Sequence, residues 1–254
     1  MSHCKLSILG LLYAASATQQ THAQVLIDGF NPVNHAHDFT FGSSEYVNRS
    51  FVRVFAGSMI GSERDAEYFQ ELATNAAGTP QFFTKFAQYE GVERFTVGGR
   101  GPGASQGRAK GYIELQYDRN GDEVDNTGFD RHLRSGGTGQ PFFVGDHYGI
   151  RVRSAANGGQ FLPTTVTLRR QGAILESSTL NLGGSGFWTD QDFMFSVASM
   201  QLTDSITFHF DINAGGSNAQ QVYIQHIETI VPEPSTCALF GFGGLYFLLR
   251  RKQT

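Results

Sequence analysis

The chain has 254 residues, a net charge of −4, 31 glycines and only 17% charged side chains. This acidic balance excludes a protein that binds the nucleic-acid backbone, because such proteins present a basic surface. Two cysteines exclude a disulfide-rich scaffold and a four-cysteine zinc site, whereas 40% hydrophobic residues are enough for a core.

Residues 1–23 have the layout of a secretory signal peptide. Lys5 supplies a positive charge, and Leu6–Ala17 is a run of apolar and small residues. Small residues follow at Thr21 and Ala23, at positions −3 and −1 of a cut after Ala23. The alternative is a short buried helix. Export is favoured because the apolar run is shorter than the roughly 20 residues that span a membrane.

The C-terminal residues 231–254 have three parts in sequence. The first is the motif Pro232-Glu233-Pro234, whose two prolines break any arriving strand or helix. The second is an uncharged apolar segment, Cys237–Leu249. The third is the basic cluster Arg250-Arg251-Lys252. Positive charge next to an apolar segment favours the cytoplasmic side of a membrane. The tail therefore predicts a single short transmembrane helix that anchors an exported body.

This tripartite tail resembles a PEP-CTERM sorting signal, with the string Val231–Thr236 as the part that matches closely. The resemblance implies that the tail is read by an exosortase, a membrane enzyme of Gram-negative bacteria that make exopolysaccharide. It covers less than a tenth of the chain. It implies processing and destination, and it implies nothing about the activity of the remainder.

Residues 24–230 form the predicted body, as one domain or two loosely joined parts. Leaving out the four cations and one acid of the two ends changes the net charge from −4 to −7. Both cysteines also lie in the ends, so the body has no disulfide. Short segments with period-2 alternation, separated by turn residues, predict strands. These segments are Phe51–Phe55, Arg94–Val97, Tyr112–Tyr117, Tyr148–Arg153, Thr164–Arg169, Asp192–Val197, Ser205–Phe210 and Gln221–Ile227.

Eight or more strands in one cysteine-free body predict a mainly β fold, a β-sandwich or jelly roll. In Tyr112–Tyr117, residues Ile113, Leu115 and Tyr117 alternate with polar residues and are expected to share one face. One segment departs from the strand pattern. Ser62 with an acid three residues later predicts a helix start, and apolar residues at 3–4 spacing predict a helix over residues 63–76.

The second half of the body resembles carbohydrate-binding-module-like, or galactose-binding-like, jelly rolls. The resemblance lies in the order of Thr164–Arg169, the Trp188 segment, Asp204–Asp211 and a final Val222–Ile227 strand. Gln225 and His226 stand where an acid and an amide are usual in that final strand. The resemblance implies a jelly-roll fold and contact with a glycan.

A cluster of acids follows the Tyr112–Tyr117 strand. Asp118, Asn120, Asp122 and Asp125 offer oxygen ligands at the spacing that calcium prefers on a tight loop. Glu123 replaces the usual turn glycine, and Phe129 stands where a bidentate acid is needed. The alternative is a β-hairpin turn, since Asn120-Gly121 is a strong turn signal. No cofactor is certain from the sequence, and calcium is the candidate cation.

Two further features point to carbohydrate. Trp188 is the single tryptophan, and such a ring can stack on a sugar or serve as a packing anchor. Glu114 and Asp190 are candidates for a glycosidase carboxylate pair. Any acidic, strand-rich domain offers such pairs, so no catalytic residue is assigned.

The sequence therefore predicts an exported, non-catalytic protein of the cell surface or extracellular matrix, associated with biofilm or exopolysaccharide. It would first be anchored in the inner membrane, sorted by an exosortase, and then reach the envelope surface or the exterior. Glycan binding is the expected activity of the body. The alternatives are a secreted enzyme that acts on polysaccharide and a purely structural surface protein.

Overall fold

A computed structural model describes residues 23–30, 39–42, 47–55, 59–72, 81–89, 92–100, 108–118, 139–156, 160–215 and 219–232. Contacts within the chain group Gln24–Ile230 into one compact unit, and the fold described below is the fold of that unit. The predicted signal peptide and the predicted transmembrane segment lie outside the described residues. In the part that is described, no helix has the length and apolar character needed to cross a membrane.

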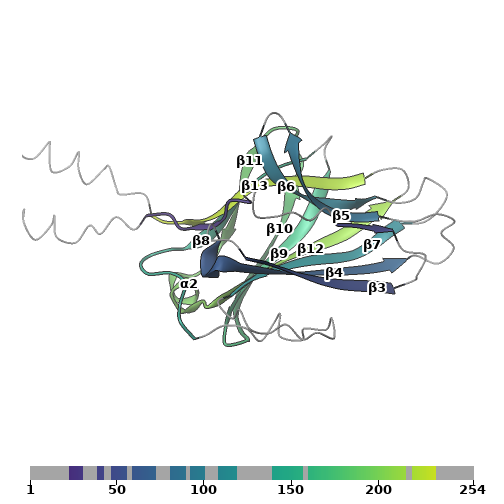
Figure 1. Cartoon of the computed structure of the whole chain (residues 1–254). Helices are drawn as coiled ribbons and strands as arrows, with labels where there is room; N and C mark the ends of the chain where they lie inside the picture. The colour runs from purple at the N-terminus through teal and green to yellow at the C-terminus, as the bar shows by residue number, and fades with distance from the viewer. Residues whose placement is uncertain are drawn as a thin grey trace, which may run out of the picture. The chain divides into compact units, whose positions relative to one another are not determined.

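The described strands form two antiparallel sheets that lie one over the other (Figure 1). The seven-stranded sheet has the order β11-β8-β13-β6-β5-β2, with β1 paired to β13. Its strands are β1 (Leu26–Asp28), β2 (Phe39–Gly42), β5 (Gln81–Tyr89), β6 (Val92–Arg100), β8 (Gly149–Ala156), β11 (Thr189–Met194) and β13 (Ala219–Ile230). This arrangement confirms the predicted mainly β sandwich.

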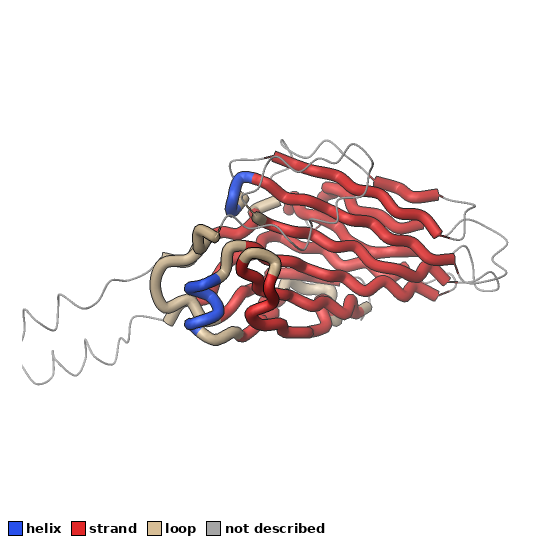
Figure 2. The backbone as a smooth tube through the Cα atoms, turned by 90° about the horizontal axis from the view of Figure 1, so that it is seen from below, coloured by secondary structure: helices blue, strands red, loops and turns tan. Residues whose placement is uncertain are grey.

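The six-stranded sheet has the order β10-β9-β12-β7-β4-β3. Its strands are β3 (Val47–Phe55), β4 (Glu63–Leu72), β7 (Arg108–Tyr117), β9 (Phe161–Arg170), β10 (Ala173–Gly183) and β12 (Ser205–Gly215). Figure 2, seen from below, shows these strands running side by side as red tubes. All the described pairings within this sheet are antiparallel.

The core lies between the sheets and follows the period-2 pattern of their strands. On β12, Ile206, Phe208, Phe210 and Ile212 are all fully buried. On β7, Ile113, Leu115 and Tyr117 are also fully buried, which confirms the predicted shared face of that strand. Since alternate residues of a strand point to opposite faces, the polar residues between them point away from this core.

A buried polar network ties the two sheets together inside this core. Asp28 of β1 is fully buried, and its Oδ2 atom accepts hydrogen bonds from Arg64 at 2.7 Å and from Tyr117 at 2.9 Å. The Phe30 backbone N–H donates to the other carboxylate oxygen at 2.7 Å. Burial raises the pKa of Asp28, although the Arg64 charge acts in the opposite direction. Burial also raises the pKa of the Tyr117 hydroxyl.

The predicted helix over residues 63–76 is wrong, because Glu63–Leu72 forms strand β4. The strand pairs with β3 on one side and β7 on the other, so its backbone groups have partners that the sequence does not reveal. Helix propensity and local caps are weak determinants against such tertiary pairing. Residues 73–76 lie outside the described residues.

Helical structure occurs elsewhere in the body, as a short turn η2 (Ile60–Ser62) and a helix α2 (Val197–Leu202). The helix begins where the predicted Asp192–Val197 strand ends: β11 stops at Met194, and Ser196 caps the helix by accepting a hydrogen bond from the Ser199 N–H at 3.2 Å. The strand prediction is therefore correct for Asp192–Met194 and wrong for Phe195–Val197.

Candidate functional site

The outward side of the six-stranded sheet carries a continuous set of polar and aromatic side chains, here called the polar face. Its members come from four adjacent strands, β9, β12, β7 and β4. They alternate with core residues, so the same period-2 pattern that builds the core also places them together. The polar face consists of Asp65, Glu67, Phe69, Tyr112, Glu114, Gln116, Thr165, Thr167, Ser205, Thr207 and His209.

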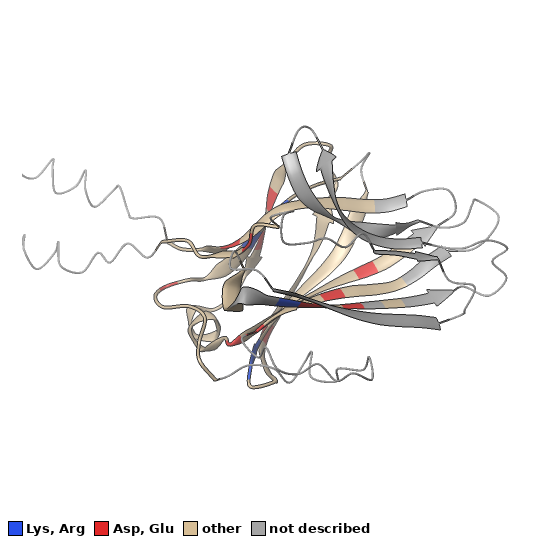
Figure 3. Cartoon of the chain, viewed as in Figure 1, with Lys and Arg blue, Asp and Glu red and all other residues tan. Residues whose placement is uncertain are grey.

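Strand register sets these side chains in two rows that cross the sheet. In one row Glu114 lies opposite Glu67 on one side and His209 on the other. In the second row Gln116 lies opposite Asp65 and Thr207. Figure 3 shows acidic residues in red on the described parts of β4 and β7. Sequence alone did not predict these rows, because β4 was expected to be a helix.

The first row holds two buried glutamates with ordered partners. Glu67 is 6% exposed and Glu114 is 3% exposed. The Tyr112 hydroxyl donates to Glu67 Oε1 at 2.9 Å, and His209 Nδ1 lies 3.0 Å from Glu114 Oε2. Such bonds compensate part of the cost of burying a carboxylate. The glutamates are thereby held in place as acceptors on the face.

Three rings from adjacent strands run along the more exposed part of the face. Phe69 stacks on Tyr112 with 5.1 Å between centroids, and Tyr112 lies 4.7 Å from the His209 ring. The His209 side chain is 34% exposed. Nε2 of His209 makes no hydrogen bond to any described residue, and it can therefore bond to a molecule on the surface.

The second row, and Ser205 two residues from it on β12, contain buried oxygen atoms without hydrogen-bond partners in the described part of the chain. These are Gln116 Oε1, Thr207 Oγ1 and Ser205 Oγ, on residues that are 1%, 3% and 0% exposed. Gln116 uses its amide nitrogen instead, donating to Asp118 Oδ2 at 2.6 Å. A buried polar atom without a partner costs stability, so each such atom calls for a water or a ligand.

Hydroxyl groups extend both rows onto β9 and the edge strand β10. Thr165 Oγ1 lies 2.8 Å from Thr179 Oγ1, and the Ser177 hydroxyl donates to Thr167 Oγ1 at 3.1 Å. Each hydroxyl both donates and accepts. The polar face therefore offers hydroxyls, carboxylates, an amide and an imidazole next to aromatic rings, which is the chemistry that complements a ligand rich in hydroxyl groups.

The predicted calcium loop is described only at its first residue. Asp118 follows β7 directly, is 3% exposed and accepts the bond from Gln116. Asn120, Asp122 and Asp125 lie outside the described residues. Within the described ranges there is no group of three or more acids, histidines or cysteines that could hold a metal. Calcium binding by this loop stays a prediction.

Trp188 lies in the connection between β10 and β11, on neither β4, β7, β9 nor β12. Hydrogen bonds hold this connection: the Gly184 N–H donates to Gln160 at 2.7 Å, and the Ala156 N–H donates to the Ser185 carbonyl at 2.8 Å. The neighbouring Phe187 is 76% exposed. Trp188 is thus not on one of the four strands that define the polar face, and its role in ligand binding stays a prediction.

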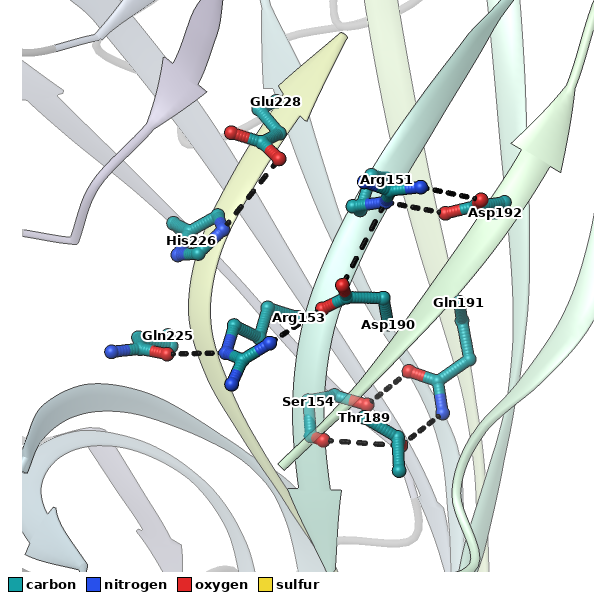
Figure 4. Close-up of polar contacts among 10 residues, drawn as sticks. All are labelled: Arg151, Arg153, Ser154, Thr189, Asp190, Gln191, Asp192, Gln225, His226 and Glu228. Atoms are coloured by element: carbon teal, nitrogen blue, oxygen red, sulfur yellow. Dashed lines mark hydrogen bonds and ion pairs between the residues drawn. The ribbon is translucent and has the colours of Figure 1, made fainter. Parts of the chain in front are cut away.

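The candidate carboxylate pair Glu114 and Asp190 is not brought together, because the two residues belong to different sheets. Asp190 lies on β11, where its carboxylate accepts from Arg153 at 3.0 Å. It belongs to a set of polar contacts on the outward side of β11, β8 and β13, here called the charged ladder and shown in Figure 4. A hydrolytic pair of Glu114 and Asp190 is therefore wrong.

The charged ladder pairs its own charges. Arg151 donates to both oxygens of Asp192, at 2.8 and 2.9 Å, and this bonding raises the pKa of the guanidinium. Arg153 also donates to Gln225 Oε1 at 2.9 Å. His226 lies 3.9 Å from Glu228. The charged and polar groups of the ladder are hydrogen-bonded or ion-paired with one another. The ladder is therefore better explained as pairs that stabilise neighbouring strands than as a binding site.

The sorting motif is described only at Pro232, which is exposed and lies shortly after the end of β13. Glu233, Pro234 and the basic cluster Arg250, Arg251 and Lys252 lie outside the described residues. Processing by an exosortase therefore stays a prediction from the sequence.

Comparison with protein-family models finds no match, and no curated protein matches the sequence. Among solved structures, the fold is similar to a carbohydrate-binding module of the β-sandwich superfamily. The identity is 9% over 73% of this chain and 74% of that chain, with a TM-score of 0.35. It is also similar to the family 11 carbohydrate-binding module of the Clostridium thermocellum cellulase Lic26A-Cel5E (10% identity, 84% of this chain, 97% of that chain, TM-score 0.35).

A third similar structure is a DUF4465 family protein from Bacteroides caccae (9% identity, 83% of this chain, all of that chain, TM-score 0.33). These structures include the class of module that the second half of the sequence resembles. Scores and identities this low show neither a shared family nor a shared ligand. The candidate site of this chain is therefore defined by its own residues, the polar face.

Proposed function

We propose that the protein is an exported, non-catalytic surface protein that binds a glycan on the polar face. One observation carries the binding proposal. Gln116 Oε1 and Thr207 Oγ1 lie opposite each other on β7 and β12, are buried, and have no hydrogen-bond partner among the described residues. Because these atoms have almost no exposed surface, a ligand rich in hydroxyl groups supplies the missing partners only when the side chains around them move aside.

The surroundings of these atoms support a glycan over a smaller polar ligand. The two rows cross four strands and continue onto β10, and neighbouring strands are about 4.8 Å apart. The face is therefore long enough for several sugar units. Its more exposed part carries Tyr112 and His209, while the carboxylates of Glu67 and Glu114 lie deeper as hydrogen-bond acceptors.

The destination of the protein is proposed from the sequence of its two ends. The signal-peptide layout of residues 1–23 supports export. The PEP-CTERM-like tail supports a membrane-anchored intermediate that an exosortase processes before the body reaches the envelope surface or the exterior. Replacing Pro232-Glu233-Pro234 by alanines is expected to leave the chain unprocessed in its host. Normal processing of that variant would remove the sorting proposal.

The binding proposal is tested with the full chain in detergent on an array of polysaccharides and oligosaccharides. Glu114→Gln is the test variant, because it weakens an acceptor of the polar face. Glu228→Gln is the matched control on the charged ladder. Binding by the wild type and the control, with loss of at least tenfold in affinity for Glu114→Gln, supports the proposal. Equal loss in both variants, or no glycan bound by any protein, contradicts it.

Calcium at the Asp118–Asp125 loop is a separate proposal, based on the oxygen-rich spacing of that sequence. Calcium is expected to raise the melting temperature of the wild type and to have no such effect on Asp122→Ala. A wild-type melting temperature that does not change with calcium ends this proposal without affecting the polar face.

A polysaccharide-cleaving enzyme is the second candidate, because Glu67 and Glu114 lie directly opposite each other across β4 and β7. Side chains in such positions have Cβ atoms about 5 Å apart, which is compatible with the carboxyl separation of about 5–5.5 Å in retaining glycosidases. Their bonds to Tyr112 and His209 favour fixed acceptors over reacting groups. New reducing ends after incubation with a bound glycan would favour the enzyme.

A further inference from the structure

The first and last strands of the body lie side by side, so both ends of the body emerge at one place. β1 pairs antiparallel with the end of β13, with Leu26 opposite Glu228 (Figure 1). The backbone of Val25 is bonded to Thr229 in both directions: the Thr229 N–H donates to the Val25 carbonyl, and the Val25 N–H donates to Thr229 Oγ1, each at 2.9 Å.

The same end of the sandwich gathers the segment 139–148 and the helix α2. The Tyr148 N–H donates to the Ile230 carbonyl at 3.0 Å, and the Phe195 N–H donates to the Tyr148 carbonyl at 2.9 Å. Gln201 of α2 donates to the Gly145 carbonyl at 3.1 Å. These bonds link the segment 139–148 to the last residue of β13, to the residue after β11 and to the helix α2.

Four of the eight large exposed apolar side chains among the described residues lie next to these bonds. Val144 is 80% exposed and precedes Gly145, and Met194 is 52% exposed and precedes Phe195. Leu202 at the end of α2 is 42% exposed, and Leu26 of β1 is 47% exposed. We call Leu26, Val144, Met194 and Leu202 the apolar pole. Exposed apolar groups that gather at one place indicate a contact with a partner or with a membrane.

The length and composition of the chain beyond β13 identify the membrane as that partner. The uncharged segment Cys237–Leu249 begins after six further residues, 231–236. Six extended residues reach at most about 20 Å. If this segment is inserted in a bilayer, as the proposed anchoring requires, the end of β13 is held within that distance of the lipid surface.

We propose that the apolar pole rests on the lipid surface while the protein is anchored, with Val144 and Leu202 inserted among the lipids. The proposal depends on the membrane anchoring stated above. It orients the body, because the side chains that touch lipid lie at the end where both termini emerge. On the outward side of the six-stranded sheet, the partly exposed rings of Tyr112 and His209 in the polar face then stay available to a glycan.

The charges at this end indicate which lipids matter. β1, the segment 139–148 and α2 contain no lysine or arginine, and their acids are the buried Asp28 and the exposed Asp146. Next to them, Glu228 lies opposite Leu26, and Arg151 is bonded to Asp192. Attraction to anionic lipids requires basic side chains. The four side chains of the pole are apolar and the nearest arginine is paired, so vesicles of neutral phosphatidylcholine are the appropriate probe.

The test places a polarity-sensitive fluorophore on the thiol of Val144→Cys in the full chain, which also carries Cys4→Ser and Cys237→Ser. The matched control is the same label on Phe187→Cys, because Phe187 is 76% exposed but precedes β11, whereas Met194 ends it. Each chain is reconstituted with phosphatidylcholine vesicles that contain brominated acyl chains. Quenching of the label at 144, with little quenching at 187, is the expected result.

The other outcomes separate the two proposals. A chain that floats with the vesicles but shows no quenching at 144 is anchored without contact at the pole, which overturns this inference and leaves anchoring intact. Equal quenching at both positions also overturns it, because the contact would then have no preferred end. A chain that does not float with vesicles contradicts anchoring itself and the pole contact that depends on it.

Discussion

The two outward faces of the sandwich differ in whether their polar groups have hydrogen-bond partners. In the charged ladder of β8, β11 and β13, the ion pairs are partly exposed, with Arg151 29% and Asp192 37% accessible, and the pairs neutralise each other. On the polar face, Gln116, Ser205 and Thr207 are buried and leave oxygen atoms without partners among the described residues. Side chains that are paired with one another require no further hydrogen-bond partner, whereas buried atoms without a partner require a water molecule or a ligand. This difference is the reason for proposing the polar face, rather than the charged ladder, as the binding face.

The largest expected effect on the free energy of unfolding comes from the buried Asp28–Arg64 ion pair, with which the exposed ion pairs of the charged ladder can be compared. Arg64→Leu removes the cation that faces Asp28 in the core, and it is expected to lower the free energy of unfolding at pH 7 by about 3–5 kcal/mol. The pKa of Asp28 is already raised by burial and would rise further without Arg64. Urea unfolding of the full chain, followed by circular dichroism, measures the loss.

The pH dependence of that variant has a definite sign. A carboxyl whose pKa is raised by folding contributes stability below its unfolded pKa and loses it as the pH rises through its folded pKa. The deficit of Arg64→Leu should therefore be smaller near pH 4 than at pH 7. A deficit independent of pH would mean that Asp28 is not the group left without a partner.

The second effect concerns binding. Tyr112→Ala removes the ring that contacts both Phe69 and His209, and it also removes the hydrogen-bond donor to Glu67. The affinity for glycan should therefore fall about tenfold or more. Arg153→Gln changes the charged ladder and should leave the affinity unchanged. Titration calorimetry with a glycan that the wild type binds compares them. A weaker ligand affinity in Arg153→Gln than in Tyr112→Ala would reverse the assignment of the two faces.

A third effect separates an unpartnered hydroxyl from a partnered one. Thr207→Val should raise the free energy of unfolding by up to about 1 kcal/mol and weaken glycan binding, because the buried Oγ1 has no partner to lose. Thr164→Val is the matched control, because Thr164 is fully buried and its hydroxyl donates to the Leu162 carbonyl at 2.9 Å. Loss of this hydrogen bond should lower the free energy of unfolding by about 1 kcal/mol. Denaturant unfolding without glycan measures both. Equal destabilisation would show that Thr207 has a structural partner.

The smallest effect is expected on the charged ladder. Asp190→Asn removes two partly exposed ion pairs, with Arg153 at 3.0 Å and with Arg151 at 3.9 Å, and it should change the free energy of unfolding by less than about 1 kcal/mol. Added salt should reduce even this difference, since exposed pairs are screened. A loss of several kcal/mol would indicate that the ladder is as important to the fold as the Asp28–Arg64 pair.

The strands that carry clear alternation were predictable, and the parts of the site that depend on pairing were not. The polar residues Glu114 and Gln116 could be placed on one face of β7 from the sequence, because Ile113, Leu115 and Tyr117 occupy the other. Their neighbours on β4 could not, since Glu63–Leu72 carries a helix-like pattern of apolar spacing. β10 was missed as well, although Gln171 and Gly172, with φ of 47° and 81°, form the kind of two-residue turn that precedes it.

The sequence by itself determined the mainly β character of the body, because period-2 alternation is a local property of each segment. It also contains the signals at the two ends on which export and sorting are proposed. Only the tertiary structure decided which strands are neighbours, since register depends on backbone partners that are distant in the chain. That choice brings Glu67, Glu114 and His209 into one row, separates Asp190 from them, and places Val25 beside Thr229. Pairing between distant segments therefore decided both the face proposed to bind a ligand and the end of the body at which its two termini emerge.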